Sequence, residues 1–266
     1  MTKVILCGAL GRMGRAILRL SLEYNNLEVT AGVEHPDCLR DQDLGKAVGM
    51  EEFKGRVLTS RLEEALPLGD VVVDFTGSPT AALAHAKLSA YARKPVVIGT
   101  TGFSQQQVEE LKELSNLAPI LLSPNMSLGV NLLFRLAQIA VKALRDKNFD
   151  VEILEIHHRF KKDAPSGTAL KLLEVSAQAL DKDPSQVGKF GREGIDPRGD
   201  EIGVMSLRGG DVVGEHTLYL IGFGERIELT HRATSRDIFA RGTLEACLWI
   251  KDKPPGFYTM LDVLEI

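Results

Sequence analysis

The chain has 266 residues, of which 44% are hydrophobic and 26% charged, and its formal net charge is −4. This composition is ordinary for a globular protein, and a chain of this length buries enough surface to fold without disulfides or a metal. The slight acidic excess argues against broad nucleic-acid binding, which calls for a basic face. Three widely spaced cysteines indicate reduced thiols, and neither a signal peptide nor a membrane anchor is recognisable. We therefore expect a cytoplasmic protein without membrane partners.

The first half of the chain alternates short apolar runs with amphipathic stretches. Helix-start signals lie between several of these runs: Ser78 precedes Pro79, and Ser104 with Gln107 forms a capping box for a helix reaching about Asn116. Repeated strand–helix–strand order predicts a Rossmann-type, doubly wound parallel sheet of the α/β class. The predicted strands are Val4–Cys7, Leu27–Val33, Val71–Phe75, Val96–Ile98 and Ile120–Leu122.

The pattern changes after Asn125. A long helix is predicted over Leu128–Leu144, a strand over Val151–His157 and a helix over Gly167–Leu180, followed by a surface loop over Asp181–Asp200. Three consecutive strands joined by glycine turns then predict an antiparallel meander, at Ile202–Arg208, Val212–Ile221 and Arg226–His231. A last helix is predicted over Asp237–Ile250.

These elements divide the chain into two domains. Residues 1–126 would form the dinucleotide-binding domain, with residues 237–266 packing back on it. Residues 127–236 would form a mixed α+β domain for substrate binding and oligomerisation. Ligands of open parallel sheets bind beyond the carboxyl ends of the strands, so we expect the site at that edge.

Three glycines follow the first predicted strand and open a helix: Gly8, Gly11 and Gly14. Such a turn lets backbone N–H groups approach a pyrophosphate at the helix start. Glu34 ends the second strand 20 residues beyond Gly14, where a carboxylate accepts the hydroxyls of an adenosine ribose. The sequence therefore predicts a dinucleotide cofactor. His35 either touches the adenosine ribose or phosphate, or lies in solvent.

Two further turns follow predicted strands and reach the same edge of the sheet. One consists of Gly99, Thr100, Thr101 and Gly102, and the other of Ser123, Pro124, Asn125 and Met126. Because both stand where ligands bind in such sheets, we expect them at the nicotinamide end of the cofactor.

A dense group of potential cations occupies residues 157–168, which read HHRFKKDAPSGT. A helix that begins at Ser166 or Gly167 presents free N–H groups and a favourable dipole to an anion. The Thr168 hydroxyl and the Lys161 ammonium add donors, so a carboxylate fits this site. His157 and His158 point to opposite sides of an extended strand, so one can serve as acid or base while the other binds ligand or packs.

Metal binding is not expected, because adjacent strand histidines diverge and no third ligand stands at suitable spacing. The remaining histidines considered, His85, His216 and His231, are expected to be structural.

The stretch 152–169, EILEIHHRFKKDAPSGTA, closely resembles the signature of the dihydrodipicolinate reductases, now called 4-hydroxy-tetrahydrodipicolinate reductases. The motifs GALGRMG, DFTGSP (74–79), GTTGF (99–103), NMSLGVN (125–131) and GEH (214–216) are similar to family motifs and occur in the family order. The resemblance implies a homotetramer of lysine and diaminopimelate biosynthesis. It also implies hydride transfer from NADH or NADPH to C4 of a cyclic dicarboxylate, with loss of water.

The resemblance further implies roles for individual residues. His157 would be the acid/base and Lys161 the proton donor, while His158, Gly167 and Thr168 would hold the substrate carboxylates. The cofactor would be lined by Gly8, Ala9, Leu10, Gly11, Arg12, Met13, Glu34, Gly99, Thr100, Thr101, Ser123, Pro124, Asn125 and Met126. Where members that use NADPH well often carry arginine, this chain carries His35, which favours NADH.

Two alternative functions also fit the sequence. One is another two-domain dehydrogenase, acting on a sugar or an amino-acid-derived substrate. The other is a non-catalytic redox sensor that binds NADH without turnover. A proton donor beside an anion pocket argues against the sensor, which needs no such group.

Overall fold

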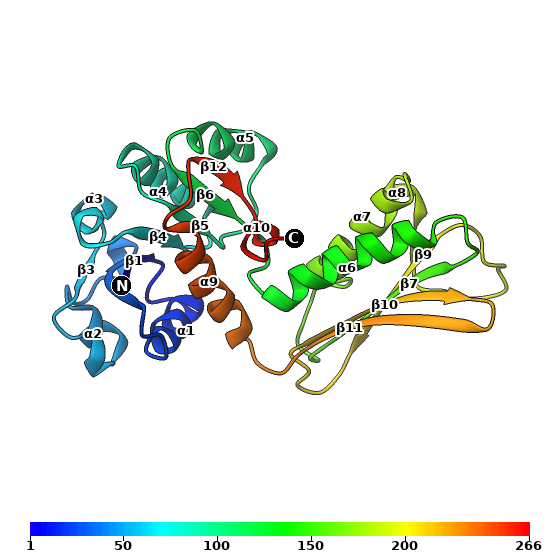
Figure 1. The fold of residues 1–266 in the computed structure, drawn as a ribbon. Helices are drawn as coiled ribbons and strands as arrows, with labels where there is room; N and C mark the ends of the chain where they lie inside the picture. The colour runs from blue at the N-terminus through cyan, green and yellow to red at the C-terminus, as the bar shows by residue number, and fades with distance from the viewer. The chain divides into compact units, whose positions relative to one another are not determined.

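The computed structural model describes residues 1–266, which form two compact units. Unit 1 contains Met1–Leu128 together with Asp237–Ile266, and unit 2 contains Gly129–Arg236 (Figure 1). The first crossing between them thus lies two residues beyond the boundary expected at residue 126. No helix combines the length and apolar character that crossing a bilayer requires.

Unit 1 is built on a seven-stranded sheet in which every pairing is parallel, as the sequence predicted. The strand order is β12-β6-β5-β4-β1-β2-β3. The last strand of the chain, which the sequence analysis did not predict, adds to the β6 edge. The bounds are β1 (Thr2–Cys7), β2 (Leu27–Val33), β3 (Val57–Thr59), β4 (Val71–Asp74), β5 (Val96–Ile98), β6 (Pro119–Leu122) and β12 (Gly256–Tyr258).

Helices cover both faces of this sheet, so its strands are apolar on both sides. In β1, Val4 and Leu6 pack into one core with α1 and α9, while Ile5 packs into the other with α4 and α5. This double burial is why the strands read as continuous apolar runs. The main helices are α1 (Arg12–Ser21), α4 (Pro79–Tyr91), α5 (Gln105–Leu114) and α9 (Asp237–Ile250). Shorter ones are α2 (Leu44–Val48), α3 (Leu62–Ala65) and α10 (Met260–Val263).

The predicted helix starts of unit 1 are confirmed. Ser78 caps α4 by accepting a hydrogen bond from the Ala81 N–H, and Pro79 opens the helix. Ser104 and Gln107 form the reciprocal capping box of α5, which ends at Leu114 rather than Asn116.

The predicted meander of unit 2 is wrong in its pairing. The sheet order is β11-β10-β7-β9-β8, and β9 pairs parallel with β7 instead of antiparallel with β10. The helix between β7 and β9 is the crossover that a parallel pair requires. Only β10 and β11 form the expected antiparallel hairpin. The bounds are β7 (Asp150–His157), β8 (Gly188–Phe190), β9 (Ile202–Arg208), β10 (Gly214–Gly222) and β11 (Glu225–Ala233).

The segment expected as a surface loop, Asp181–Asp200, contains the short helix α8 (Pro184–Val187) and strand β8. The Asp183 side chain accepts a hydrogen bond from the Ser185 N–H and so caps α8. Composition alone hid these elements, because Pro, Asp and Gly occur at helix starts as well as in loops.

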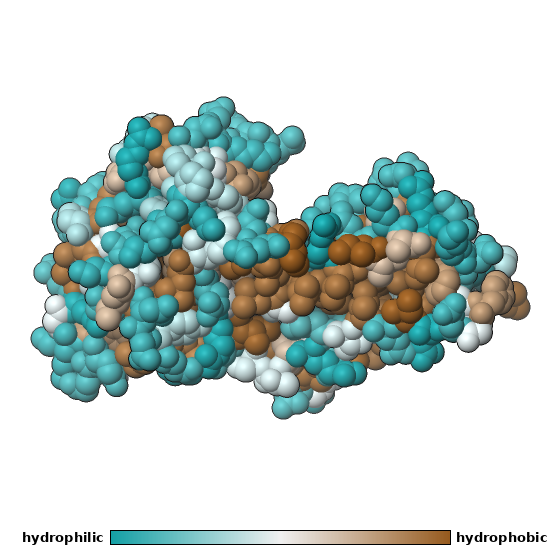
Figure 2. Space-filling model, viewed as in Figure 1, coloured by the Kyte–Doolittle hydropathy of each residue, from teal (hydrophilic) through white to brown (hydrophobic).

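Helices α6 (Leu128–Leu144) and α7 (Gly167–Ala179) cover one face of the unit 2 sheet (Figure 1). Their apolar side chains share a core with Ile153, Val204 and Leu218. The other face of the sheet has no covering element within this unit, and Leu207 there is 50% exposed. A band of apolar surface also runs along α6 (Figure 2), where Leu132, Leu136 and Ile139 are exposed.

Candidate functional site

The glycine turn of unit 1 leaves the start of α1 accessible. Gly8 has φ +82°, and a Cβ there would lie 2.6 Å from the Phe75 carbonyl oxygen. A Cβ on Gly14 would lie 2.3 Å from the Gly8 carbonyl oxygen, so the helix can follow the turn closely only with glycine. Gly11 caps α1 without any side-chain hydrogen bond. The N–H groups at the helix start therefore remain available to an anion.

Glu34 is held next to this turn by backbone donors. One carboxylate oxygen accepts a hydrogen bond from the Leu10 N–H at 2.9 Å, and the other accepts one from the His35 N–H at 3.0 Å. A carboxylate has about four acceptor positions, so this one can accept about two further hydrogen bonds. Arg12, at the start of α1, and His35, which follows Glu34, are both exposed. The His35 ring accepts a hydrogen bond from the Asp37 N–H at 3.3 Å.

The fully buried carboxylate of Asp74 joins the loops that follow β4 and β5. It accepts hydrogen bonds from the Thr100 hydroxyl at 2.7 Å and from the Thr76 hydroxyl at 2.9 Å. His85 of α4 lies 2.7 Å from its second oxygen, which gives this histidine the partner that sequence reasoning could not name. The Thr100 hydroxyl is engaged in this way, whereas the side chain of Thr101 is exposed.

The turn after β6 is organised similarly. The buried Ser123 hydroxyl donates to the Asn125 carbonyl oxygen at 2.7 Å, and the Asn125 side chain accepts from the Ser127 N–H at 2.9 Å. Pro124 is exposed and Met126 is buried. The structure thus brings all predicted cofactor residues to the carboxyl edge of one sheet.

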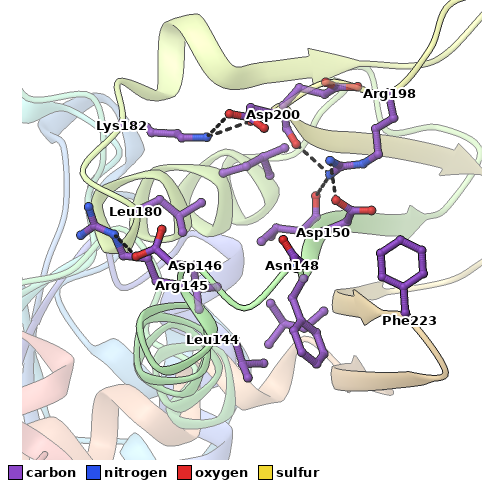
Figure 3. Close-up of a pocket in the computed structure, with 16 residues that line it drawn as sticks. Leu144, Arg145, Asp146, Asn148, Asp150, Leu180, Lys182, Arg198, Asp200 and Phe223 are labelled. Carbon is purple, nitrogen blue, oxygen red and sulfur yellow. Dashed lines mark hydrogen bonds and ion pairs between the residues drawn. The ribbon is translucent and has the colours of Figure 1, made fainter.

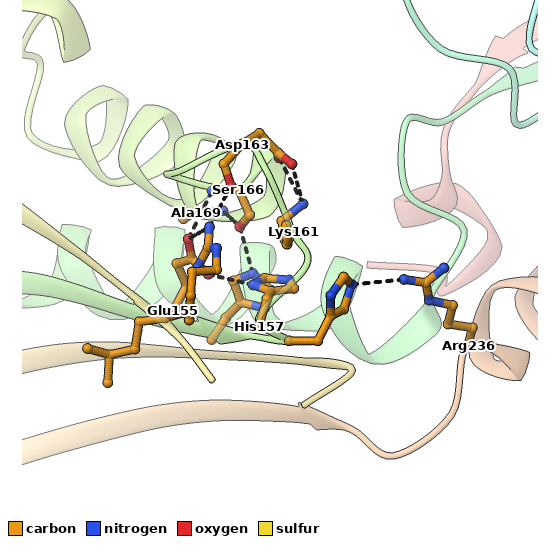
Figure 4. Close-up of polar contacts among 11 residues, drawn as sticks. Glu155, His157, Lys161, Asp163, Ser166, Ala169 and Arg236 are labelled. Atoms are coloured by element: carbon orange, nitrogen blue, oxygen red, sulfur yellow. Dashed lines mark hydrogen bonds and ion pairs between the residues drawn. The ribbon is translucent and has the colours of Figure 1, made fainter. Parts of the chain in front are cut away.

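In unit 2 the central feature is a buried carboxylate, Glu155. Successive inward positions of β7 carry Val151, Ile153, Glu155 and His157, so the strand passes from apolar core to polar cluster. Arg208 of β9 donates to both Glu155 oxygens at 2.8 and 2.9 Å, a bidentate pair. His157 Nδ1 lies 2.5 Å from one of these oxygens (Figure 4).

The same carboxylate anchors the start of α7. Glu155 accepts a hydrogen bond from the Ser166 N–H at 3.1 Å, and the Ser166 hydroxyl caps the helix by accepting from the Ala169 N–H. The Ser166 hydroxyl also lies 2.9 Å from His216 Nε2. His216, expected to be structural, thus belongs to the cluster, with its ring centroid 5.1 Å from that of His157.

Electrostatics leave this cluster with one ionised acid and neutral histidines. Burial opposes ionisation of Glu155, but hydrogen bonds from Arg208 and His157 outweigh it and lower its pKa to about 2. Burial lowers the pKa of His157, against the opposing effect of Glu155. Burial, reinforced by His157, lowers the pKa of His216 to about 3. At neutral pH both rings are therefore predominantly uncharged.

The other predicted substrate residues lie on the loop after β7 and at the start of α7. Lys161 Nζ donates to both oxygens of Asp163 at 2.8 and 2.9 Å. His158 does not join the Glu155 cluster. Its Nε2 instead lies 3.1 Å from the Arg236 guanidinium (Figure 4). Gly167 is exposed and Thr168 half-buried in the first turn of α7.

Sequence reasoning missed Glu155, Arg208, Ser166 as a link to His216, and Arg236. Only Glu155 carried a signal, since it shares the inward alternation of Val151, Ile153 and His157 on one strand. The partners on other strands, Arg208 and His216, can be found only from the correct strand order, and the predicted meander did not give that order.

Two groups of donor atoms lie within 4.8 Å of one another and so resemble metal sites: Cys7 with Asp74 and His85, and Glu155 with His157 and His216. In both, the carboxylate already serves donors within the protein. A cation in the second group would have to displace the bidentate Arg208 pair.

A cavity of about 490 Å³ also exists in unit 2, but at the Asp150 end of β7 rather than the His157 end. It lies at the end of α6, at Leu144, and beside Leu180, which directly follows α7, and Phe223 also lines it (Figure 3). Its cations are paired, Lys182 with Asp200 and Arg198 with Asp150. None of the predicted site residues contributes to it.

Comparison with known proteins matches both units. The family model for the N-terminus of dihydrodipicolinate reductase matches residues 2–126, and that for its C-terminus matches residues 129–264. The 4-hydroxy-tetrahydrodipicolinate reductase of Aquifex aeolicus is 65% identical over 263 residues, which cover 98% of each chain. That of Syntrophobacter fumaroxidans is 44% identical over 99% of each chain.

Among solved structures, one is similar to this chain in sequence and fold, and another in fold alone. Dipicolinate-bound dihydrodipicolinate reductase from Paenisporosarcina sp. TG-14 has a TM-score of 0.79 and 25% identity over 97% of each chain. A myo-inositol dehydrogenase from Lactobacillus casei covers 99% of this chain with a TM-score of 0.60 but only 15% identity, so it shares the fold alone. The family resemblance seen in the sequence motifs is thus confirmed: the chain belongs to the dihydrodipicolinate reductase family of nicotinamide-dinucleotide-dependent oxidoreductases.

Proposed function

We propose that the chain reduces 4-hydroxy-tetrahydrodipicolinate to tetrahydrodipicolinate with NADH or NADPH, as a cytoplasmic enzyme of lysine and diaminopimelate biosynthesis. The observation that carries this proposal within the molecule is the cluster at the end of β7. There a carboxylate-bound imidazole, a lysine and the start of a helix occur together, which suits an acid/base reaction on a dianion.

His157 is the proposed acid/base of the reaction. It is neutral at working pH and therefore able to accept a proton, and Nδ1 is engaged by Glu155. Lys161 is the proposed proton donor, since its ammonium carries three N–H groups on a flexible stem.

His158, Gly167 and Thr168 are the proposed ligands of the substrate carboxylates. Gly167 and Thr168 stand in the first turn of α7, where the helix dipole favours a negatively charged group. The relative from Paenisporosarcina was solved with dipicolinate, a planar dicarboxylate, which supports a dicarboxylate pocket of this kind.

The proposed cofactor site is the carboxyl edge of the unit 1 sheet. Residues 8–13 would face the pyrophosphate. Gly8 and Gly14 let the chain turn tightly into α1, since a Cβ at either position would collide with backbone, and this turn brings the N–H groups of the helix start to the ligand. Glu34 would accept the adenosine ribose hydroxyls, and residues 99–101 and 123–126 would line the nicotinamide end. When bound, the cofactor supplies the hydride.

The function is tested most directly by a coupled assay. Enzymically generated 4-hydroxy-tetrahydrodipicolinate mixed with the chain and NADH should cause loss of the reduced-nicotinamide absorbance. A sugar such as myo-inositol with the oxidised cofactor serves as the control for a general two-domain dehydrogenase. Absence of turnover with either reduced cofactor would contradict the proposal.

Replacing Lys161 should separate chemistry from cofactor binding. Lys161→Ala should lower kcat by about 10²–10⁴-fold, the usual loss when a general acid is removed. NADH affinity should stay nearly unchanged, and dipicolinate should bind more weakly. The matched control is Lys162→Ala, an exposed neighbour of equal charge, which should behave as wild type. Equal kinetics for the two variants would reject the role of Lys161.

We further propose a modest preference for NADH. The Glu34 carboxylate would repel a 2′-phosphate, and the exposed His35 cannot offer the bidentate grip of an arginine. Wild type should therefore show roughly tenfold higher kcat/KM with NADH, equivalent to about 1.4 kcal/mol. His35→Arg should raise kcat/KM for NADPH and leave that for NADH little changed. A wild type that favours NADPH would show this interpretation of Glu34 and His35 to be mistaken.

We also propose a homotetramer assembled through the outer face of the unit 2 sheet. Apolar side chains on that face are only partly buried within the chain, namely Leu154, Ile156, Met205, Leu207, Tyr219 and Ile221. An uncovered apolar surface of this kind usually marks a partner interface.

Light scattering at micromolar concentration should therefore report a tetramer. Leu207→Glu should dissociate it, because burying an unpaired charge in an interface is costly. Leu68→Glu, at an exposed leucine of unit 1, is the control and should remain tetrameric. A monodisperse wild-type monomer would contradict the assembly.

A further inference from the structure

We propose that Glu155 is a positioning residue that sets the tautomer and orientation of His157, and that Arg208 holds Glu155 in place for this task. The inference rests on the proposed function in one respect only, the acid/base role of His157. The geometry itself belongs entirely to unit 2.

The carboxylate of Glu155 and the imidazole of His157 are in direct contact. Glu155 and His157 are two residues apart on β7 and therefore point to the same face of the sheet. The ionised carboxylate accepts from His157 Nδ1, so the neutral ring carries its proton there. That leaves Nε2 as the nitrogen able to exchange a proton.

Gly214 of β10 makes room for the Nε2 edge of the ring. A Cβ at this position would lie 2.9 Å from His157 Nε2, closer than side chains tolerate. The contact with Glu155 orients the imidazole, and the ring of His216 packs against it edge-on.

Arg208 comes from β9, where it stands opposite His157 in the parallel register. Its guanidinium binds both Glu155 oxygens and also donates to the Asp163 carbonyl oxygen at 2.5 Å. The side chain of Asp163 is the ion-pair partner of Lys161. One buried ion pair therefore orients His157 and anchors the loop that carries the proposed proton donor.

The charges around His157 give this arrangement a measurable signature. The groups facing it are Glu155 on the same strand, Arg208 on β9, His216 on β10 and Lys161 on the loop. Glu155 raises the pKa of His157, whereas Arg208 and Lys161 lower it. Removing Glu155 or Arg208 should therefore shift the pKa of His157 in opposite directions, which general structural damage would not produce.

The experiment uses nitrogen-15 NMR of the histidine rings in the full-length protein, with the His157 signal assigned by its loss in His157→Gln. Wild type should show the Nδ1–H tautomer. Glu155→Gln should lower the pKa of His157 and reduce this tautomer, while Arg208→Gln should raise the pKa. In the assay, Glu155→Gln should lower kcat by at least about 10²-fold, with the KM for NADH within about twofold of wild type.

The matched control is Glu152→Gln. Glu152 lies on the same strand and pairs with Arg198 at 3.3 Å, but it faces away from the histidine. Its replacement should leave both the His157 spectrum and kcat unchanged. If Glu155→Gln does not fold, the wild-type tautomer and the Arg208→Gln titration still decide the matter.

An Nε2–H tautomer in wild type, or pKa shifts of equal sign in the two variants, would overturn the inference. A wild type without turnover would instead refute the proposed function and leave the NMR result standing. The two failures are therefore distinguishable.

Discussion

The structure of unit 2 depends on keeping one ionised carboxylate inside the protein. A buried, charged Glu155 would be strongly destabilising by itself, so it must be matched by a cation and by donors to its remaining lone pairs. Arg208 supplies the cation, and Ser166 and His157 supply the other hydrogen bonds. These partners come from β7, β9 and the start of α7. Satisfying the charge therefore fixes the relative positions of the elements that carry the candidate catalytic groups.

A buried carboxylate plays a similar part in unit 1. Asp74 is fully buried and accepts from Thr76, Thr100 and His85, which ties two strand-end loops and α4 together. Its partners are two threonine hydroxyls and an imidazole, and no arginine contacts it. In both units a carboxylate near the end of a strand holds neighbouring loops together. Rigid loops matter for hydride and proton transfer, since the reacting atoms must be placed to within a fraction of an ångström.

The polar networks explain why the sequence predicts candidate ligand-binding residues but not the residues that support them. Glycines, a strand-end acid and a basic helix start have local signatures, because each reflects backbone geometry within a few residues. His216 and Arg208 have none. Their roles arise from lying opposite Glu155 and His157 on neighbouring strands. The predicted meander placed β9 beside β10 and did not pair it with β7, the strand of Glu155, although the intervening helix α7 was itself evidence for a parallel crossover.

The sequence by itself determined the parallel sheet of unit 1, the capped starts of α4, α5 and α7, and the family, because local periodicity, capping chemistry and motif order are all written along the chain. Tertiary structure alone decided that β7 is central in unit 2, that His85 pairs with Asp74, and that His157 is bound to a carboxylate anchored by β9. Two of these side-chain contacts join residues far apart in the chain: His85 and Asp74 are 11 positions apart, and Arg208 and Glu155 are 53 positions apart. Side-chain spacing within a strand or helix carries no record of which distant element will neutralise a buried charge. Which element supplies the partner of the buried charge depends on the complete tertiary fold.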